Sequence, residues 1–231
     1  MTFVSALDYT LIPVTAAVFG AIVAAYIRPG PIVASAIQHF SAGVVFAAAA
    51  GEVLPSVKHN AALWPIVVGG GAGIVVMLLI KELGERTKSQ TGLVALIGVD
   101  LFIDGLVLGL GFAASTKAGI LLTIALTLEV LFLGLSLAAE LSDAAMTRAR
   151  TVGLVASVAL LLPAGVVAAS SIAQLSPSVL TGFFAFGLIA LLYLVTEELL
   201  VEAHETPDRP WVTALFFVGF LLLLVLEEMI V

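Results

Sequence analysis

The chain has no cysteine and few charged residues. Without cysteine it has no disulfides, no thiolate metal sites and no thiol chemistry. Only 11% of its 231 residues are charged, whereas a soluble domain carries about a quarter. Lys and Arg number 9 against 16 Asp and Glu, which gives a net charge of −7. A chain so poor in basic residues is not expected to bind nucleic acid.

Long apolar runs take the place of the missing charge: 61% of the residues are hydrophobic, and the mean hydropathy is +1.23. A membrane-spanning helix needs roughly 20 mainly apolar residues. Short breaks such as "RPGP" and "TPDRP" separate eight such runs. We therefore expect one all-α integral membrane domain over residues 1–231, embedded in the lipid bilayer. The expected spans are about 7–27, 32–54, 61–83, 92–115, 118–141, 151–171, 178–201 and 211–231.

The basic residues predict the orientation, because Lys and Arg favour cytoplasmic loops. With the N-terminus outside, seven of them fall on the cytoplasmic side and two on the outer side. The seven are Arg28, Lys81, Arg86, Lys88, Arg148, Arg150 and Arg209, and the two are Lys58 and Lys117. An even number of spans then places both termini outside, and we expect the cytoplasmic (inner) membrane.

A weak internal symmetry relates the second and seventh spans. Gly43 precedes Glu52, and Gly187 precedes Glu197, each by about ten residues. The first three and last three spans would form two units of opposite orientation around spans four and five. That inverted-repeat plan is common among secondary transporters, which bind substrate near the bilayer midplane.

Three acidic residues lie near the middle of two successive spans. Asp100 and Asp104, in "GVDLFIDGLVLGLG", are one helical turn apart, and Glu129 lies at a similar depth in the next span. Carboxylates in low dielectric must be protonated or must hold a cation. Since no Lys or Arg is expected at that depth, the three predict a divalent-cation site. Protonated carboxyl groups joining helices by hydrogen bonds are the alternative.

Other acids lie nearer the ends of the spans. Glu52 is near the outer end of the second span, and the pair Glu197 and Glu198 is near the inner end of the seventh. We expect them to act as the outer entry and the inner exit of a cation route, with Glu202 and His204 following the pair. Ordinary interfacial solvation is the alternative for each. His39, in the inner third of the second span, fits a core histidine as well as a relay.

Glycines on the same spans predict close helix packing. Gly105 and Gly109 form a small-xxx-small pair in the fourth span, and Gly134 lies in the fifth. Such residues let two backbones approach each other in a membrane. We expect them to position neighbouring helices and to take no part in the chemistry.

These segments resemble the ZIP family of divalent metal permeases, which have eight spans, both termini outside, and metal ligands on spans four and five. "DLFIDGLVLGLG" is similar to the family motif His-Asn-x-Pro-Glu-Gly, with Asp100 at the histidine, Asp104 at the glutamate and Gly105 at the glycine. "EVLFLG" is similar to His-x-x-x-Glu-Gly, with Glu129 at the histidine and Leu133 at the glutamate. "AGVVFAAAAGEVLP" and "LYLVTEELLVEAHE" resemble family segments of spans two and seven.

The chain departs from the family motifs at several ligand positions. Acids replace both signature histidines, Leu101 replaces the asparagine, and Leu133 replaces a glutamate. The sixth span, 151–171, has no ionisable residue. The family can carry two adjacent metal sites, and these changes leave one all-carboxylate site. The resemblance implies a divalent metal ion of the zinc, iron, manganese or cadmium class as the cargo. Because imidazole suits zinc and carboxylate suits harder ions, the altered ligands do not predict selectivity for zinc.

The expected function is transport of this ion toward the cytoplasm, with no enzymatic activity, and the resemblance also implies a homodimer. A proton-coupled carrier of another solute, with Asp100 and Asp104 as a titrating pair, stays open. So does a relative that binds metal without transporting it. An intramembrane aspartyl protease is disfavoured because such enzymes usually carry their two aspartates on different helices.

Overall fold

The computed structural model describes residues 3–27, 30–58, 63–87, 89–143, 146–207 and 209–230. These residues form helices and connecting turns, and no strand occurs among them. Arg28 and Lys88, which contributed to the predicted orientation, lie outside the described residues, as do positions 61–62 and 231 at the edges of two expected spans.

Eight helices among the described residues are long and apolar enough to cross a membrane, as the sequence predicts. The second span is interrupted by the π-helical turn η1, the seventh by η2, and the sixth is broken into α7 and α8. The elements are α1 (Phe3–Tyr26), α2 (Pro31–Ala48), η1 (Ala49–Val53), α3 (Leu54–Lys58), α4 (Leu63–Arg86), α5 (Gln90–Ala114), α6 (Thr116–Asp143), α7 (Arg148–Ala159), α8 (Leu161–Ile172), α9 (Pro177–Tyr193), η2 (Leu194–Leu199), α10 (Leu200–Ala203) and α11 (Pro210–Met229).

The interruptions have different chemical settings. Pro163 follows the break at Leu160 and has no N–H to donate to the carbonyl of Ala159. No proline lies within either π-helical turn, and both turns contain glutamate: Glu52 in η1, and Glu197 with Glu198 in η2. Single π-helical turns inside α-helices occur frequently at functional sites.

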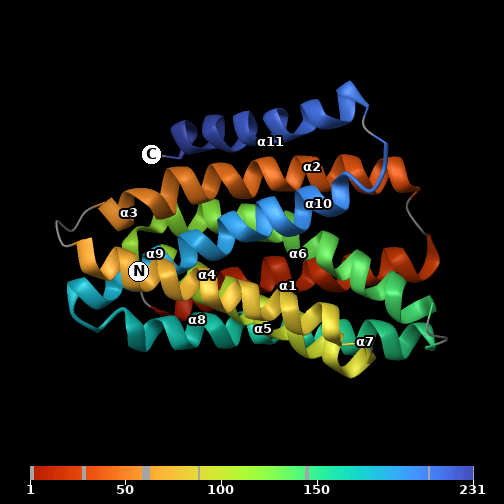
Figure 1. The fold of residues 1–231 in the computed structure, drawn as a ribbon, viewed down its shortest axis with the longest axis horizontal. Helices are drawn as coiled ribbons and strands as arrows, with labels where there is room; N and C mark the ends of the chain where they lie inside the picture. The colour runs from red at the N-terminus through yellow and green to blue at the C-terminus, as the bar shows by residue number, and fades with distance from the viewer. Residues whose placement is uncertain are drawn as a thin grey trace.

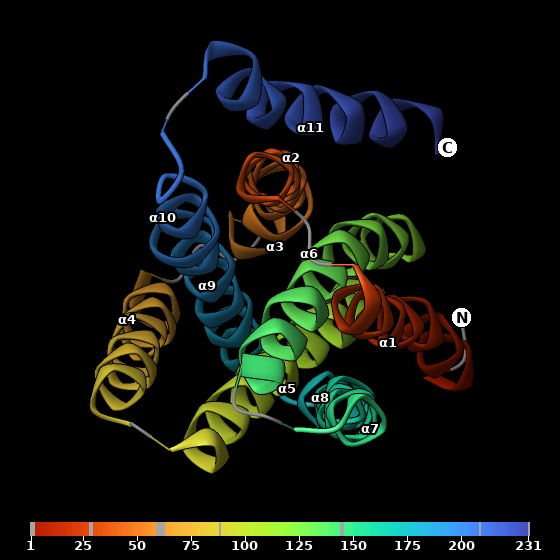
Figure 2. The same cartoon turned by 90° about the vertical axis from the view of Figure 1, so that its right-hand side faces the viewer.

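The helices lie side by side along one long axis (Figure 1). Seen along that axis, α6 and the middle of α5 lie inside the bundle, while α4 and α11 lie at its periphery (Figure 2). Large apolar side chains such as Leu78 on α4 and Phe217 on α11 are exposed, as expected for helices that face lipid. The core gathers around α5 and α6, so any polar group there is shielded from water.

Glycines bring the inner helices into backbone contact, as predicted for Gly105, Gly109 and Gly134. A Cβ atom at Gly105 would overlap the backbone carbonyl of Leu162 on α8, and one at Gly109 would overlap Ala169. On α6, a Cβ at Gly134 would overlap the backbone of α1 at Ala17. The pairs α5–α8 and α1–α6 are therefore held at a separation that only glycine permits.

The outer pairs pack in the same way. Gly43 of α2 meets the backbone of Phe216 on α11, and Gly219 of α11 meets the backbone of Phe40 on α2. Gly69 of α4 meets Gly182 of α9. Backbone proximity thus joins α2 to α11 and α4 to α9, in addition to the two inner pairs.

Candidate metal centre

The three midplane acids predicted from the sequence meet inside the bundle. Asp100 and Asp104 come from α5 and Glu129 from α6. One carboxylate oxygen of each can be chosen so that all lie within 4.8 Å of one another. The three residues are 6%, 2% and 1% exposed respectively, so protein atoms cover almost all of their surface. We call them the carboxylate trio.

A tight helical hairpin brings the trio together. Ser115 alone separates α5 from α6: its backbone N–H donates to the carbonyl of Gly111, and its Oγ accepts from the N–H of Ala118 at 2.9 Å. The two helices therefore run antiparallel and in contact. Asp104 and Glu129 stand at similar distances along the chain from Ser115, which places them at one level.

Three of the trio's six carboxylate oxygens lack a hydrogen-bond donor among the described residues. Both oxygens of Glu129 and Oδ2 of Asp104 are buried, and no N–H or hydroxyl donor in the described part of the chain reaches them. An unpaired buried carboxylate is strongly unfavourable. The trio must therefore share protons among its own carboxyl groups or hold a cation.

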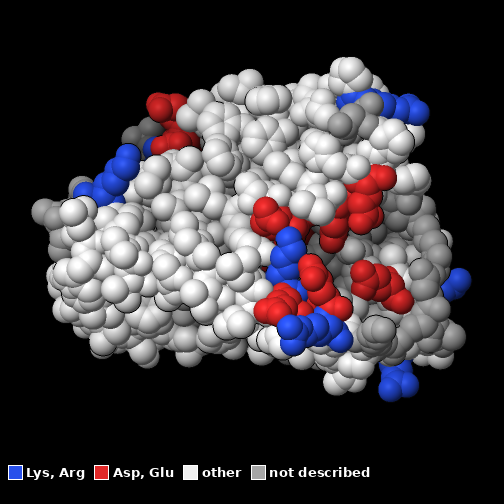
Figure 3. Space-filling view, in the orientation of Figure 1, with Lys and Arg blue, Asp and Glu red and all other residues white. Residues whose placement is uncertain are grey.

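A cavity of about 230 Å³ opens from the trio toward one end of the bundle. Asp100 and Glu129 line its inner part, and Glu198, Glu202 and Glu140 line it farther out. Figure 3 shows acidic side chains gathered around a hollow on this face, with a basic group among them. The cavity thus gives a small cation an acidic path to the trio.

The predicted Glu197–Glu198 pair divides in the structure. Glu198 is partly buried and lines the cavity, whereas Glu197 does not. Lys81 of α4 holds Glu197 instead, with 2.8 Å between Nζ and Oε2. Of the two, only Glu198 stands where a passing ion would meet it.

Glu202 and His204 also separate. Glu202 lines the cavity, and its Oε2 accepts a hydrogen bond of 2.6 Å from Nε2 of Gln38. His204 is not among the residues that line the cavity, and its ring lies beside the ring of His39. Sequence patterns alone offered no signal for Gln38, because its partner lies on a helix distant in the chain.

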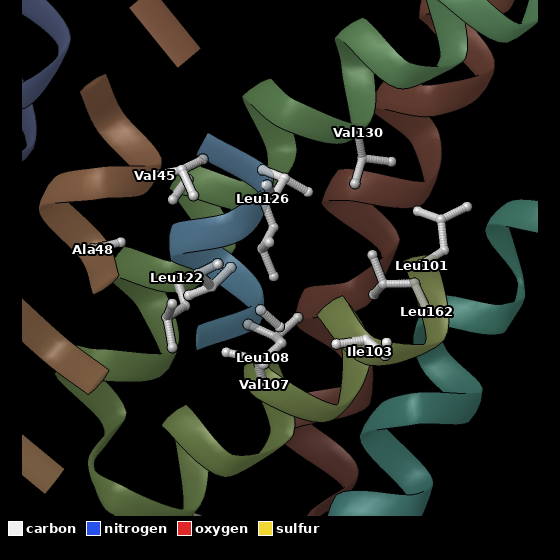
Figure 4. Packing of buried hydrophobic residues seen from close by; sticks show 14 of the residues in the cluster. Val45, Ala48, Leu101, Ile103, Val107, Leu108, Leu122, Leu126, Val130 and Leu162 are labelled. Carbon is white, nitrogen blue, oxygen red and sulfur yellow. The ribbon is translucent and has the colours of Figure 1, made fainter. Parts of the chain in front are cut away.

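Glu52 lies at the opposite end of the bundle, in a second hollow of about 590 Å³. Its Oε1 is buried without a hydrogen-bond partner among the described residues. Packed apolar side chains, including Val45, Leu108 and Leu122, fill the interior of the bundle (Figure 4). Along the chain, Leu108 follows Asp104 and Leu122 precedes Glu129, so both lie between the trio and the α5–α6 connection, which borders this second hollow. The trio is therefore open toward the Glu198 end and closed toward the Glu52 end.

Compared with known proteins, the chain matches no family model and no curated sequence. The relation to ZIP permeases therefore stays a prediction.

Proposed function

We propose that this protein is a ZIP-like transporter that carries a divalent metal ion across the cytoplasmic membrane into the cell. The observation that carries the proposal is the carboxylate trio, which is buried and has three oxygens that no donor among the described residues reaches. A single divalent cation offsets most of the repulsion among three carboxylates. Oxygen ligands suit manganese and related hard ions, while zinc, iron and cadmium also accept carboxylate. Because carboxylates must lose protons to bind metal, acid is expected to weaken binding.

The cavity supports an inward-facing state under the predicted orientation. The end of the bundle that carries Glu198 would face the cytoplasm, and the end that carries Glu52 would face outward. An ion bound at the trio would leave past Glu198 and Glu202, which line the open path. Glu52 would attract ions to the outer hollow, and the apolar layer would have to open for them to enter.

Helix contacts support the inverted-repeat arrangement. An inverted repeat would exchange spans 1, 2 and 3 with spans 6, 7 and 8, and span 4 with span 5. The contact between span 1 (α1) and span 5 (α6) then corresponds to the contact between span 6 (α8) and span 4 (α5). The same exchange turns the α2–α11 contact into the contact of α9 with α4. Two units of opposite orientation would produce these paired contacts, and such units place their binding site at the centre.

The second and seventh spans also match in local structure. Each begins with a proline at its first helical position, Pro31 or Pro177. Each then runs 18 or 17 residues as α-helix before a π-helical turn that contains glutamate. The two spans therefore match more closely in local structure than in the spacing between glycine and glutamate in the sequence. The match places Glu52 and the glutamates of η2 at equivalent positions.

The orientation can be measured by labelling, because the chain has no cysteine of its own. Ser89 precedes α5 and Ser176 precedes α9, and both are exposed. An impermeant maleimide should label Ser176→Cys in cells with an intact cytoplasmic membrane. It should label Ser89→Cys only after permeabilisation. The opposite pattern would reverse the proposed direction of both termini.

Uptake by purified protein in liposomes tests the function. Mn²⁺, Cd²⁺ or Zn²⁺ added outside should reach a trapped metal-sensitive dye faster than in protein-free liposomes. Glu198→Gln should slow the initial rate about tenfold or more, since polar groups beside a metal path commonly contribute 10–100-fold. Its side chain lines the cavity, and the substitution removes charge with little change of shape.

Glu197→Gln is the matched control in the same assay. It neutralises the neighbouring residue, which does not line the cavity, and breaks that residue's ion pair with Lys81, which does. An exposed ion pair of this kind is worth about 1 kcal/mol or less. Uptake should stay within about fivefold of the parent, the factor that corresponds to about 1 kcal/mol. Equal losses of uptake in both variants would contradict the assignment of Glu198 alone to the ion path.

Metal binding without uptake would favour a non-transporting protein, and solute-driven proton movement without metal uptake would favour a proton-coupled carrier.

A further inference from the structure

Two histidines from distant parts of the chain meet at the Glu198 end of the bundle, outside the carboxylate trio. His39 lies on α2 and His204 directly follows α10. Their ring centroids are 5.0 Å apart, with an angle of 61° between the ring planes. His39 is 2% exposed, whereas His204 is exposed. The contact therefore joins a buried imidazole to one that reaches water.

Backbone carbonyls determine the tautomer of both rings. Nδ1 of His39 lies 2.9 Å from the carbonyl oxygen of Ser35, and Nδ1 of His204 meets the carbonyl of Leu200. Since a carbonyl oxygen only accepts, each Nδ1 carries the proton, and each neutral ring has its lone pair on Nε2. In metal-bound histidines, the ring nitrogen that does not bind the metal usually donates a hydrogen bond to such an acceptor, which orients the ring.

The Nε2 of His39 is the unexplained group. It is buried and has no hydrogen-bond partner among the described residues. A buried acceptor without a partner is unfavourable unless something binds it. Apart from a proton, a metal ion is the ligand that a neutral imidazole nitrogen takes most readily.

Hydrogen bonds between the two helices hold the histidines in place. Oγ of Ser35 donates to the carbonyl of Ala203 at 2.8 Å, and Nε2 of Gln38 donates to Glu202 at 2.6 Å. Ser35, Gln38 and His39 are all buried. The approach of the two rings is therefore fixed by neighbours on both sides of the contact.

We propose that His39 and His204 form a second metal site, an imidazole site for a transition metal ion such as Zn²⁺, Cu²⁺ or Ni²⁺. Metal–nitrogen bonds of about 2.0–2.1 Å in tetrahedral geometry place two ring centres about 5 Å apart, and the centroid separation of 5.0 Å is compatible with this spacing. Water fills the remaining coordination positions on the exposed His204 side. The site differs in chemistry from the trio, since nitrogen ligands favour softer ions than carboxylates do.

The site does not depend on the proposed transport function, because it uses none of the trio residues. Its place beside Glu202, which lines the cavity, would let it hold an ion near the cytoplasmic mouth. A spectroscopic signal from imidazole nitrogen distinguishes the histidine site from the proposed transport site, because the trio has only oxygen ligands.

The test uses Cu²⁺ as a spectroscopic probe of the full-length protein, purified without a polyhistidine tag. Electron spin-echo modulation should show ¹⁴N from two imidazoles. His204→Gln, at an exposed position, should abolish the two-imidazole signal, and so should His39→Gln. In a parallel calorimetric titration, each variant should bind one Zn²⁺ fewer than the parent. Asp104→Asn should keep the nitrogen signal while losing the carboxylate site.

His59→Gln is the matched control, because it removes the chain's third histidine. It should leave the nitrogen signal and the Zn²⁺ stoichiometry unchanged. An unchanged signal in His204→Gln would overturn the proposal, and so would a signal lost only in His59→Gln. Since the replacement at His204 lies on the surface, that result holds even where His39→Gln does not fold.

Discussion

Asp104→Asn should bind Mn²⁺ and Cd²⁺ at least about 100-fold more weakly than the parent, because even residues that only support metal ligands contribute about 10–100-fold. Asp104 is 2% exposed, and its Oδ2 has no donor partner among the described residues. The amide keeps the shape of the carboxylate but supplies no charge. Calorimetric titration in detergent measures the loss, and uptake into liposomes should cease.

The same variant should be as stable as the parent, or more stable, when no metal is present. Without metal the three buried carboxyl groups avoid repulsion only by taking up protons, and the substitution removes one ionisable group from this cluster, so the apoprotein loses an unfavourable interaction. The melting temperature without metal should be unchanged or higher, and metal should no longer raise it. Lower stability without metal, combined with normal metal binding, would favour a hydrogen-bonded carboxyl pair.

Glu82→Gln serves as the control for charge. Glu82 is exposed and pairs with Arg86 one turn along α4, a contact of little energetic weight. The substitution Glu82→Gln removes one negative charge, as Asp104→Asn does, and leaves the trio unchanged. Metal affinity should therefore match the parent.

Gly105→Ala should destabilise the protein by about 3 kcal/mol, at the upper end of overpacking effects. The added Cβ would overlap the backbone carbonyl of Leu162, which cannot rotate away as a side chain could. Relief requires α5 and α8 to separate, and Asp104 lies directly beside Gly105 in the chain. Both the melting temperature, followed by circular dichroism, and the affinity for metal should fall.

Gly71→Ala is the matched control for this substitution. Nothing lies within 4 Å of a Cβ at Gly71 on α4. Alanine is favoured over glycine in a helix by about 0.5–1 kcal/mol, so this variant should melt at the same temperature or higher. Equal destabilisation at both positions would show that helix separation is not responsible.

The spans were predictable because a lipid environment imposes a simple rule on sequence. Each span must hide its backbone polar groups in a helix about 20 residues long, so length and hydropathy together mark it. The fourth span, expected at 92–115, runs Thr91–Ala114, and the fifth, expected at 118–141, runs Thr116–Leu141. The meeting of Asp100 and Asp104 with Glu129 followed from the short connection between these two spans.

Partners from non-adjacent spans could not be predicted. Lys81 holds Glu197 across α4 and η2, and His39 meets His204 across most of the chain. Apolar periodicity is weak in helices surrounded by lipid and apolar neighbours, so it does not say which face meets which helix. The division between Glu197 and Glu198 depends on these contacts and on the local winding of η2.

The winding of η2 also sets how the protein can tolerate changes of length. A π-helical turn holds one residue more than an α-helical turn, and one residue corresponds to about 100° of rotation. Deleting a single residue from Leu194–Leu199 would restore a regular helix, and the tighter α-helical winding would offset most of that rotation, so that Glu202 keeps nearly the same direction relative to α9. In evolutionary terms, η2 can absorb a one-codon insertion or deletion without turning the helices on either side, and the same holds for η1, which contains Glu52.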